Sequence, residues 1–151
     1  MANTQAMCTS FKTEILSGIH ALGTTVIRAG TGADTLKAAL YLASATVNAA
    51  TTAYSASGEV SGAGYSAGGV TVTNATAPTS SGTTAYWTSS ASFTYTTVTL
   101  ATSFDCVLVY NSTQANKAIS AHTFGAQTIT AGTFVLSMPV NDASNALIRI
   151  A

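Results

Sequence analysis

Two histidines and two cysteines are the residues in this sequence most able to perform nucleophilic, acid–base or metal chemistry. His20 and His122 each stand alone, without the HxH or HExxH spacing of a zinc site. Asp105, Cys106 and His122 could in principle supply an orienting acid, a nucleophile and a base. Adjacent residues of a strand point to opposite faces, however, so Asp105 and Cys106 cannot both face one pocket. The sequence therefore predicts no catalytic residue, no metal ligand and no cofactor.

The acidic residues and the glycines lead to the same expectation. No two of the five acids have the spacing of paired catalytic carboxylates: Glu14, Asp34, Glu59, Asp105 and Asp142. The run GAGYSAGG at residues 62–69 lacks the lysine of a phosphate-binding loop and does not open a helix. We interpret it as a loop whose glycines adopt positive φ angles. We expect the protein not to be an enzyme.

Composition narrows the class of protein further. The chain has 151 residues, of which 47% are hydrophobic and only 7% charged, and its net charge is zero. About 25% charged residues is usual, and clustered Lys and Arg are needed to bind nucleic acid or an anionic membrane. Thr, Ser and Gly take the place of the charges, which suits a subunit of an assembly. We therefore expect no direct nucleic-acid partner and no membrane partner.

The cysteines and the N-terminus bear on the compartment. Cys8 and Cys106 lie outside any CxxC or Cys/His pattern, so we expect both to pack as small apolar side chains. The sequence begins without the basic and apolar regions of a signal peptide, and no stretch approaches the ~20 apolar residues of a membrane span. These features predict synthesis in a cytoplasm.

Residues 1–33 are predicted to form an N-terminal helix and arm. Ser10 is a suitable N-cap, Gly23 a suitable end, and the apolar positions between them have helical spacing: Phe11, Ile15, Leu16, Ile19 and Leu22. This apolar stripe packs either on the protein's own sheet or on a neighbouring subunit. Residues 24–29 form either a short strand or an extended arm.

Residues 34–151 are predicted to form a mainly β domain. Residues 34–42 are interpreted as a strand, although a helix stays possible there, and residues 43–69 are rich in loops. Turns are expected at residues 78–82 and 111–113, and residues 104–110 as a central strand. The other expected strands are 70–73, 84–88, 92–100, 117–124, 127–129, 133–138 and 146–150. About eight short strands predict an antiparallel β-sandwich of two sheets, with a jelly roll as one form of it.

Two further features concern association. Tyr86, Trp87, Phe93 and Tyr95 are close in sequence, and alternation places Phe93 and Tyr95 on one face. We expect these rings in the core or at a subunit interface, with carbohydrate stacking as the alternative. The last strand needs a sheet partner, either in its own chain or at another subunit's edge.

Four strings in the sequence are specific enough to suggest a family. They are residues 34–41 (DTLKAALY), 51–69 (TTAYSASGEVSGAGYSAGG), 107–117 (VLVYNSTQANK) and 143–151 (ASNALIRIA). Together they resemble a family of small virion structural proteins of tailed bacteriophages, most specifically at residues 58–62 and 64–69. The resemblance covers residues 34–151 and brings no catalytic or ligand residue with it. It implies a virion protein made in the host cytoplasm, most plausibly a capsid decoration or cement protein.

Such a protein would have two kinds of partner, the major capsid protein and copies of itself in a dimer or trimer. The main alternative is a head- or tail-fibre or connector component, which shares the Thr- and Gly-rich β composition. A pilin-like subunit would need a secretion signal, and a small hydrolase would need an acid–base constellation that the sequence does not show.

Overall fold

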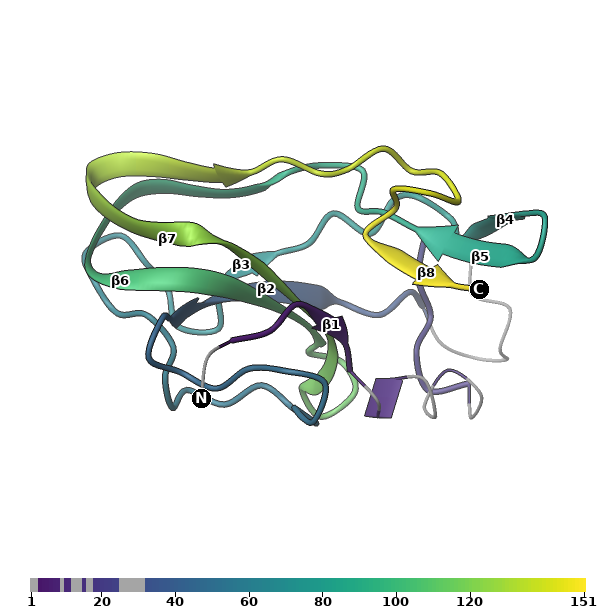
Figure 1. The fold of residues 1–151 in the computed structure, drawn as a ribbon, viewed down its shortest axis with the longest axis horizontal. Helices are drawn as coiled ribbons and strands as arrows, with labels where there is room; N and C mark the ends of the chain where they lie inside the picture. Colours follow the sequence, from purple (N-terminus) through teal and green to yellow (C-terminus); the bar gives the residue numbers. More distant parts are fainter. Residues whose placement is uncertain (1–2, 9, 12–14, 16–17, 25–31) are drawn as a thin grey trace.

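All the elements of the described chain are β-strands. The computed structural model describes residues 3–8, 10, 11, 15, 18–24 and 32–151. These form a five-stranded sheet in the order β1-β7-β6-β2-β3 and a three-stranded sheet in the order β4-β5-β8, both antiparallel (Figure 1). The strands are β1 (Ala6–Met7), β2 (Leu36–Leu42), β3 (Val70–Thr71), β4 (Thr79–Ser81), β5 (Thr84–Trp87), β6 (Phe93–Asn111), β7 (Lys117–Leu136) and β8 (Ile148–Ile150). The prediction of a mainly β chain is confirmed.

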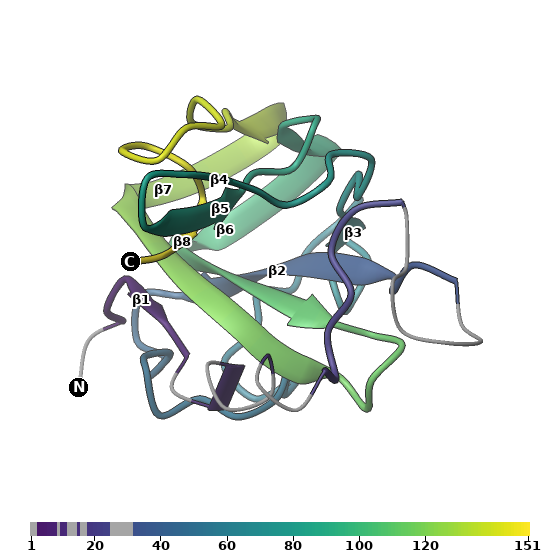
Figure 2. The same ribbon diagram turned by 90° about the vertical axis from the view of Figure 1, so that its right-hand side faces the viewer.

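Two very long strands, β6 and β7, dominate the molecule. They have 19 and 20 residues and pair along their length, but their register shifts repeatedly between Tyr95 and Cys106. Thr97 in β6 and Ala131 in β7 have positive φ angles, as bulged residues often do. The ribbon formed by β6 and β7 therefore bends back over itself, which gives an upper and a lower layer (Figures 1 and 2).

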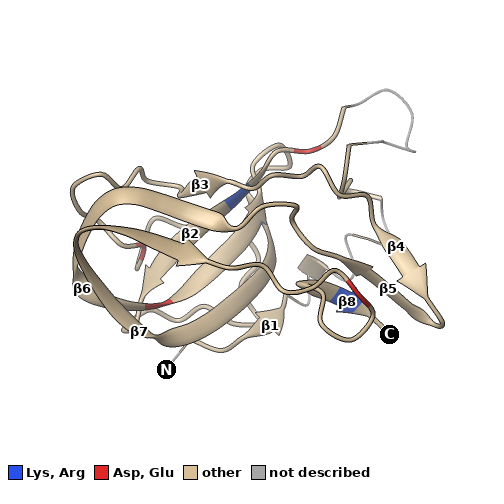
Figure 3. Cartoon of the chain, turned by 90° about the horizontal axis from the view of Figure 1, so that it is seen from above, with Lys and Arg blue, Asp and Glu red and all other residues tan. Residues whose placement is uncertain are grey.

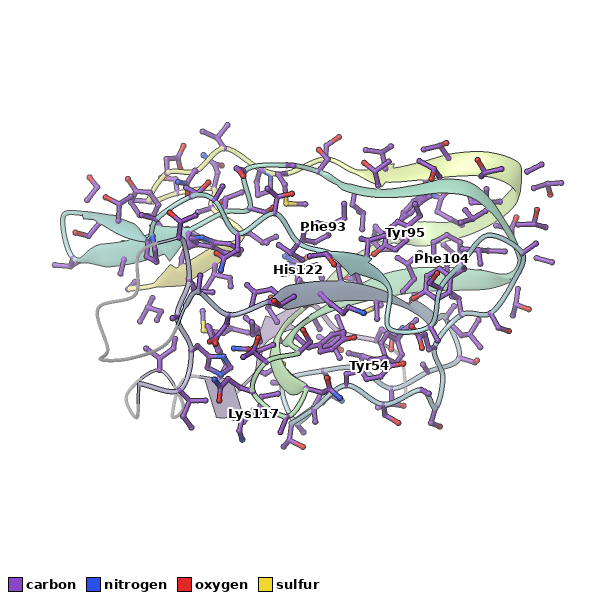
Figure 4. The ribbon with its side chains drawn as sticks, turned by 180° about the vertical axis from the view of Figure 1, so that it is seen from behind. Tyr54, Phe93, Tyr95, Phe104, Lys117 and His122 are labelled. Carbon is purple, nitrogen blue, oxygen red and sulfur yellow. The ribbon has the colours of Figure 1, made fainter. Side chains whose placement is uncertain are left out.

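One part of the core lies between these two layers. In the lower layer, β2 and residues 106–111 of β6 are buried on both faces. Along the upper arm of β6, Phe93 and Tyr95 are buried while Thr94 and Thr96 are exposed, as strand alternation requires. Figure 4 shows Phe93, Tyr95 and Phe104 between the layers. The rings of Phe104 and Phe134 pack edge to face, with their centroids 5.1 Å apart. Such contacts favour one packing arrangement of the folded ribbon.

The predicted strands merge in the structure. Residues 92–100 and 104–110 belong to the single strand β6, and the three expected strands between residues 117 and 138 belong to β7. The intervening residues are small or polar and exposed, so they resemble loops in sequence, yet bulges keep them paired. Residues 104–110 do form a central strand, with β7 on one side and β2 on the other. The last strand, β8, pairs with β5 of the same chain.

Of the expected N-terminal helix, the structure describes only Ser10, Phe11 and Ile15 in helical conformation, and no helix is among its elements. Gly18 has a φ of 68° and its N–H donates to the carbonyl of Ile15 at 2.9 Å, so the chain turns there and Ile19 to Leu22 are not helical. The hydroxyl of Ser10 has no hydrogen-bond partner among the described residues, and residues 12 and 13, whose N–H groups an N-cap at Ser10 would bind, lie outside them. The prediction of a helix ending at Gly23 is wrong, because a left-handed glycine ends the helical geometry earlier. Residues 12–14, 16–17 and 25–29 of the predicted helix and arm lie outside the described residues.

The turn expected over residues 78–82 is also placed differently. Residues 79–81 form β4, and the turn itself is at Gly82 and Thr83, where Gly82 has a φ of 58°. The polar sequence TSS suggested a turn, but β4 is an exposed edge strand, which tolerates polar residues on both faces.

The glycines of residues 58–69 allow the backbone of this segment to lie directly against the backbones of β2 and β6. A Cβ at Gly69 would overlap the carbonyl of Ala38 in β2, and one at Gly62 would overlap the carbonyl of Thr99 in β6. Gly69 also has a φ of 73°, which disfavours any side chain. We call residues 54–69 the glycine-rich loop; it covers β2 and the bend of β6.

This close approach predicts different costs for two otherwise similar substitutions. A Cβ at position 82 would have no atom within 4 Å, so the cost of Gly82→Ala comes only from the left-handed backbone conformation there. This substitution should lower the free energy of unfolding by about 1 kcal/mol. Gly69→Ala adds a clash with β2 and should cost about 3 kcal/mol or more. Urea unfolding of both variants measures the difference. Equal losses would contradict the packing of the loop on β2.

Candidate functional site

The possible triad of Asp105, Cys106 and His122 is not assembled. In the register of β6 and β7, His122 lies opposite Val107 whereas Cys106 lies opposite Thr123, so the imidazole and the thiol occupy opposite faces. Asp105 accepts a hydrogen bond from Asn3 Nδ2 at 2.7 Å. Burial raises the pKa of the Cys106 thiol to about 12, and the nearby Asp105 carboxylate adds to this. The thiol therefore stays protonated and packs in the core, as expected for both cysteines.

His122 instead forms a pair with Ser120, which the sequence analysis did not predict. Ser120 Oγ lies 2.8 Å from His122 Nε2, and both residues lie on one face of β7 because they are two positions apart. Burial lowers the pKa of His122 to about 4, so the imidazole is neutral at pH 7. The pair borders a groove of about 250 Å³ between β1 and β8, which Arg149 also lines.

This pair is an incomplete nucleophilic site. The side chain of Ser120 is buried, with 1% of the residue exposed. None of the hydrogen bonds described for His122 joins it to a carboxylate that would orient the ring. Among the described residues, no group of three or more His, Cys, Asp and Glu could hold a metal ion. The geometry is that of a satisfied polar pair within a packed sheet.

A buried acid fastens the N-terminal segment to the ends of β2 and β6. Asp34 Oδ2 accepts hydrogen bonds from Asn111 Nδ2 at 2.8 Å and from the N–H of Ala21 at 3.0 Å. Gln114 Nε2 donates to the other oxygen at 3.3 Å, and Asn111 Nδ2 also lies 3.0 Å from His20 Nδ1. A buried carboxylate needs such partners, and here they hold segments distant in sequence together.

The most elaborate polar cluster surrounds Glu59, and no sequence pattern pointed to it. Oε1 of Glu59 accepts hydrogen bonds from the Tyr65 hydroxyl and from the N–H of Gly68, both at 2.7 Å. Oε2 accepts one from the Tyr54 hydroxyl at 2.7 Å. All three donors and the carboxylate belong to the glycine-rich loop, so this cluster fixes the loop's conformation.

Tyrosines then attach the loop to the sheet beneath it. The Tyr65 hydroxyl accepts from the N–H of Leu40, and the Tyr110 hydroxyl donates to the carbonyl of Gly68 at 2.9 Å. The Tyr110 ring stacks on that of Tyr54 with centroids 4.7 Å apart. Burial, with the Glu59 carboxylate adding to it, raises the pKa of Tyr110 to about 12. The hydroxyl therefore remains a donor throughout the physiological range.

The aromatic residues singled out from sequence lie mostly in the core. Phe93 and Tyr95 share a buried face, as alternation predicted, and Trp87 is 1% exposed. Trp87 Nε1 donates to the carbonyl of Thr76 at 2.7 Å. Tyr86, next to Trp87, is only half-buried. The three buried rings contribute packing and offer no open stacking surface.

The surface that β6 and β7 offer to a partner is uncharged over most of its length. Residues 60–104 and 118–141 contain no Lys, Arg, Asp or Glu. They include most of the ribbon of β6 and β7, whose exposed side chains are chiefly Thr, Ala and Ser. Figure 3 shows the upper arm of this ribbon free of charged residues. The groups that this surface presents to a partner are hydroxyl groups, methyl groups and main-chain atoms.

Comparisons with known proteins found no match among family models, curated proteins or solved structures. Within the part of the chain that the structure describes, no helix has the length and apolar character needed to cross a membrane.

Glu59→Gln tests the cluster that fixes the glycine-rich loop. The three donors bind two carboxylate oxygens of Glu59, whereas glutamine has only one acceptor oxygen in its side chain. The free energy of unfolding should therefore fall by about 2–3 kcal/mol. Amide hydrogen exchange in residues 58–68 should accelerate. The control is Asp142→Asn, because the bonds of this exposed acid stay within its own turn. Equal effects of both variants would contradict the role of Glu59.

His122 should make the fold sensitive to acid. Its pKa in the folded chain, about 4, lies below the ordinary value of 6.5, so the unfolded chain binds the proton more readily. The contribution of the neutral His122 ring to the free energy of unfolding is fully present above about pH 6.5. It is lost as the pH falls towards 4, by up to about 3 kcal/mol. Histidine ring NMR should show His122 neutral at pH 5, and His122→Gln should remove this part of the pH dependence. A ring that titrates near 6.5 would refute the assignment.

Proposed function

We propose that this protein is a non-enzymatic structural component of a tailed-phage virion, specifically a decoration or cement protein of the capsid. In this proposal the folded ribbon and the small sheet form a β-sandwich-like domain. The observation that carries the proposal is the uncharged, Thr-rich surface of β6 and β7. The resemblance of residues 34–151 to small virion proteins supports the same placement.

An uncharged surface suits permanent attachment to a shell. Contacts between exposed charges weaken as salt screens them, whereas apolar and main-chain contacts change little with ionic strength. A stable interface needs about 800 Å² on each partner. The exposed residues of both long strands gather on the upper arm and the bend of the ribbon, which offers a suitable shape for such a contact.

The polar clusters favour a structural role. Asp34, Glu59 and His122 are engaged in hydrogen bonds that hold segments of the fold together. A catalytic group, by contrast, must reach a substrate with its reacting atom. The hydrogen bonds that these carboxylates accept stabilise one conformation of the backbone.

The proposed mechanism is the addition of buried area across seams of the shell. Copies of the protein bind where major capsid subunits meet, so internal DNA pressure must break additional contacts before the shell opens. Binding to the assembled shell alone stabilises it by mass action. Copies associate with closed symmetry as a dimer or trimer, and the protein contacts neither nucleic acid nor membrane directly.

The proposal predicts where the protein lies and how it binds. Immunogold electron microscopy of intact virions should place label over the whole head, and shells stripped of the protein should melt at lower temperature. Recombinant protein should restore that temperature almost equally at about 0.05 and 0.5 M salt. Label confined to the tail or to one vertex, or stripping without effect on melting, would overturn the proposal.

A pair of matched variants tests the surface itself. Thr96→Lys with Thr102→Lys adds two charges to exposed positions of β6, and should weaken binding to stripped shells. Ser57→Lys with Ser61→Lys adds the same charge to exposed positions of the glycine-rich loop and should bind as the wild type does. The reverse order of affinities would assign the contact to the loop.

A further inference from the structure

One edge of the large sheet is left open along most of β7. On the side away from β6, β7 pairs with β1, and that pairing involves only Ser120 and Ala121 of β7. From residue 123 to residue 136, no strand of the described chain pairs with this edge. An open strand edge presents main-chain donors and acceptors in the spacing that another strand requires.

This edge lacks most of the features by which proteins prevent strand pairing. Charged side chains, prolines and bulges are the usual protections. Residues 123–138 include neither a charged residue nor a proline. The pairing of β7 with β6 is irregular between Thr123 and Phe134, where Ala131 has a φ of 46°, and it becomes regular from Phe134 to Leu136.

Residues 132–136 follow the positive-φ residue Ala131 and end in this regular part. Exposure alternates along these residues: Thr133 and Val135 face outward, with Val135 48% exposed, whereas Phe134 and Leu136 pack against the core. The edge strands β1, β3, β4 and β8 have only two or three residues each. The upper arm of β6, on its side away from β7, has the glycine-rich loop against Thr97 and Thr99.

We propose that residues 132–136 of β7 pair in antiparallel fashion with the same residues of a second copy of this chain, joining two sheets across a twofold axis. A strand that pairs antiparallel with itself needs no separate partner surface, and both copies use the same edge, so the assembly closes at two. Neutrality favours this partner, because two uncharged edges approach without like-charge repulsion and a charged partner would find no countercharge here.

The geometry of such pairing is favourable on both faces. Thr133 and Val135 of one copy come beside the same side chains of the other, and β-branched cross-strand pairs stabilise sheets. On the inner face, Phe134 and Leu136 of the two copies extend the core across the joint. This inference specifies how copies of the protein associate within the proposed function. It rests on that function only for its biological role, because the dimer is a property of the free protein.

Analytical ultracentrifugation of the purified chain tests the inference. The wild type should be a dimer at micromolar concentration, and Thr133→Lys with Val135→Lys should weaken dimerisation at least about tenfold, because four lysines then meet at the joint. Ser57→Lys with Ser61→Lys supplies the same added charge elsewhere and should leave the dimer intact. Circular dichroism confirms that each variant is folded.

Hydrogen exchange on the wild type provides a measurement that needs no substitution. Amides of residues 132–136 should exchange more slowly at concentrations where the dimer forms than in the dilute monomer. A monomeric wild type, a dimer indifferent to the edge variant, or open-ended growth with concentration would each overturn the inference. Failure of virion labelling would leave these results unchanged, so the two proposals fail separately.

Discussion

The carboxylate of Glu59 is the constraint on which the rest of the structure depends. Withdrawing a charge from water is costly unless the charge is hydrogen-bonded, and the half-buried Glu59 receives bonds from two tyrosine hydroxyls and one backbone N–H. These bonds give the glycine-rich loop one conformation. Only in that conformation can its glycines lie against the backbones of β2 and β6, where any side chain would clash. The loop thereby closes one side of the core.

The second determinant is the bend in the ribbon of β6 and β7. Bulges let two long strands stay paired while they fold back, so one sheet supplies both layers of the core. The inner faces carry aromatic residues, of which Tyr95 also donates a hydrogen bond to the carbonyl of Ala38 in β2. The outer faces carry Thr and Ala. The same fold that buries the rings thus creates the uncharged surface and the open edge of β7.

Sequence patterns predicted what depends on local alternation and missed what depends on distant partners. Phe93 and Tyr95 were correctly placed on one buried face, because a strand repeats every two residues. The helix ending at Gly23 was wrong, since apolar spacing cannot show that Gly18 turns the chain. Glu59 was interpreted only as an isolated acid. Its role depends on three-dimensional proximity to tyrosines of the loop, which no spacing rule encodes.

The measurement that tests the account most directly is a cryo-electron microscopy reconstruction of the intact virion head, resolved to the level of strands. The account predicts density for this fold over the seams between capsid subunits, with the ribbon of β6 and β7 against the shell and the glycine-rich loop away from it. Density for this chain only in the tail, or attachment to the head through the loop, would contradict the account.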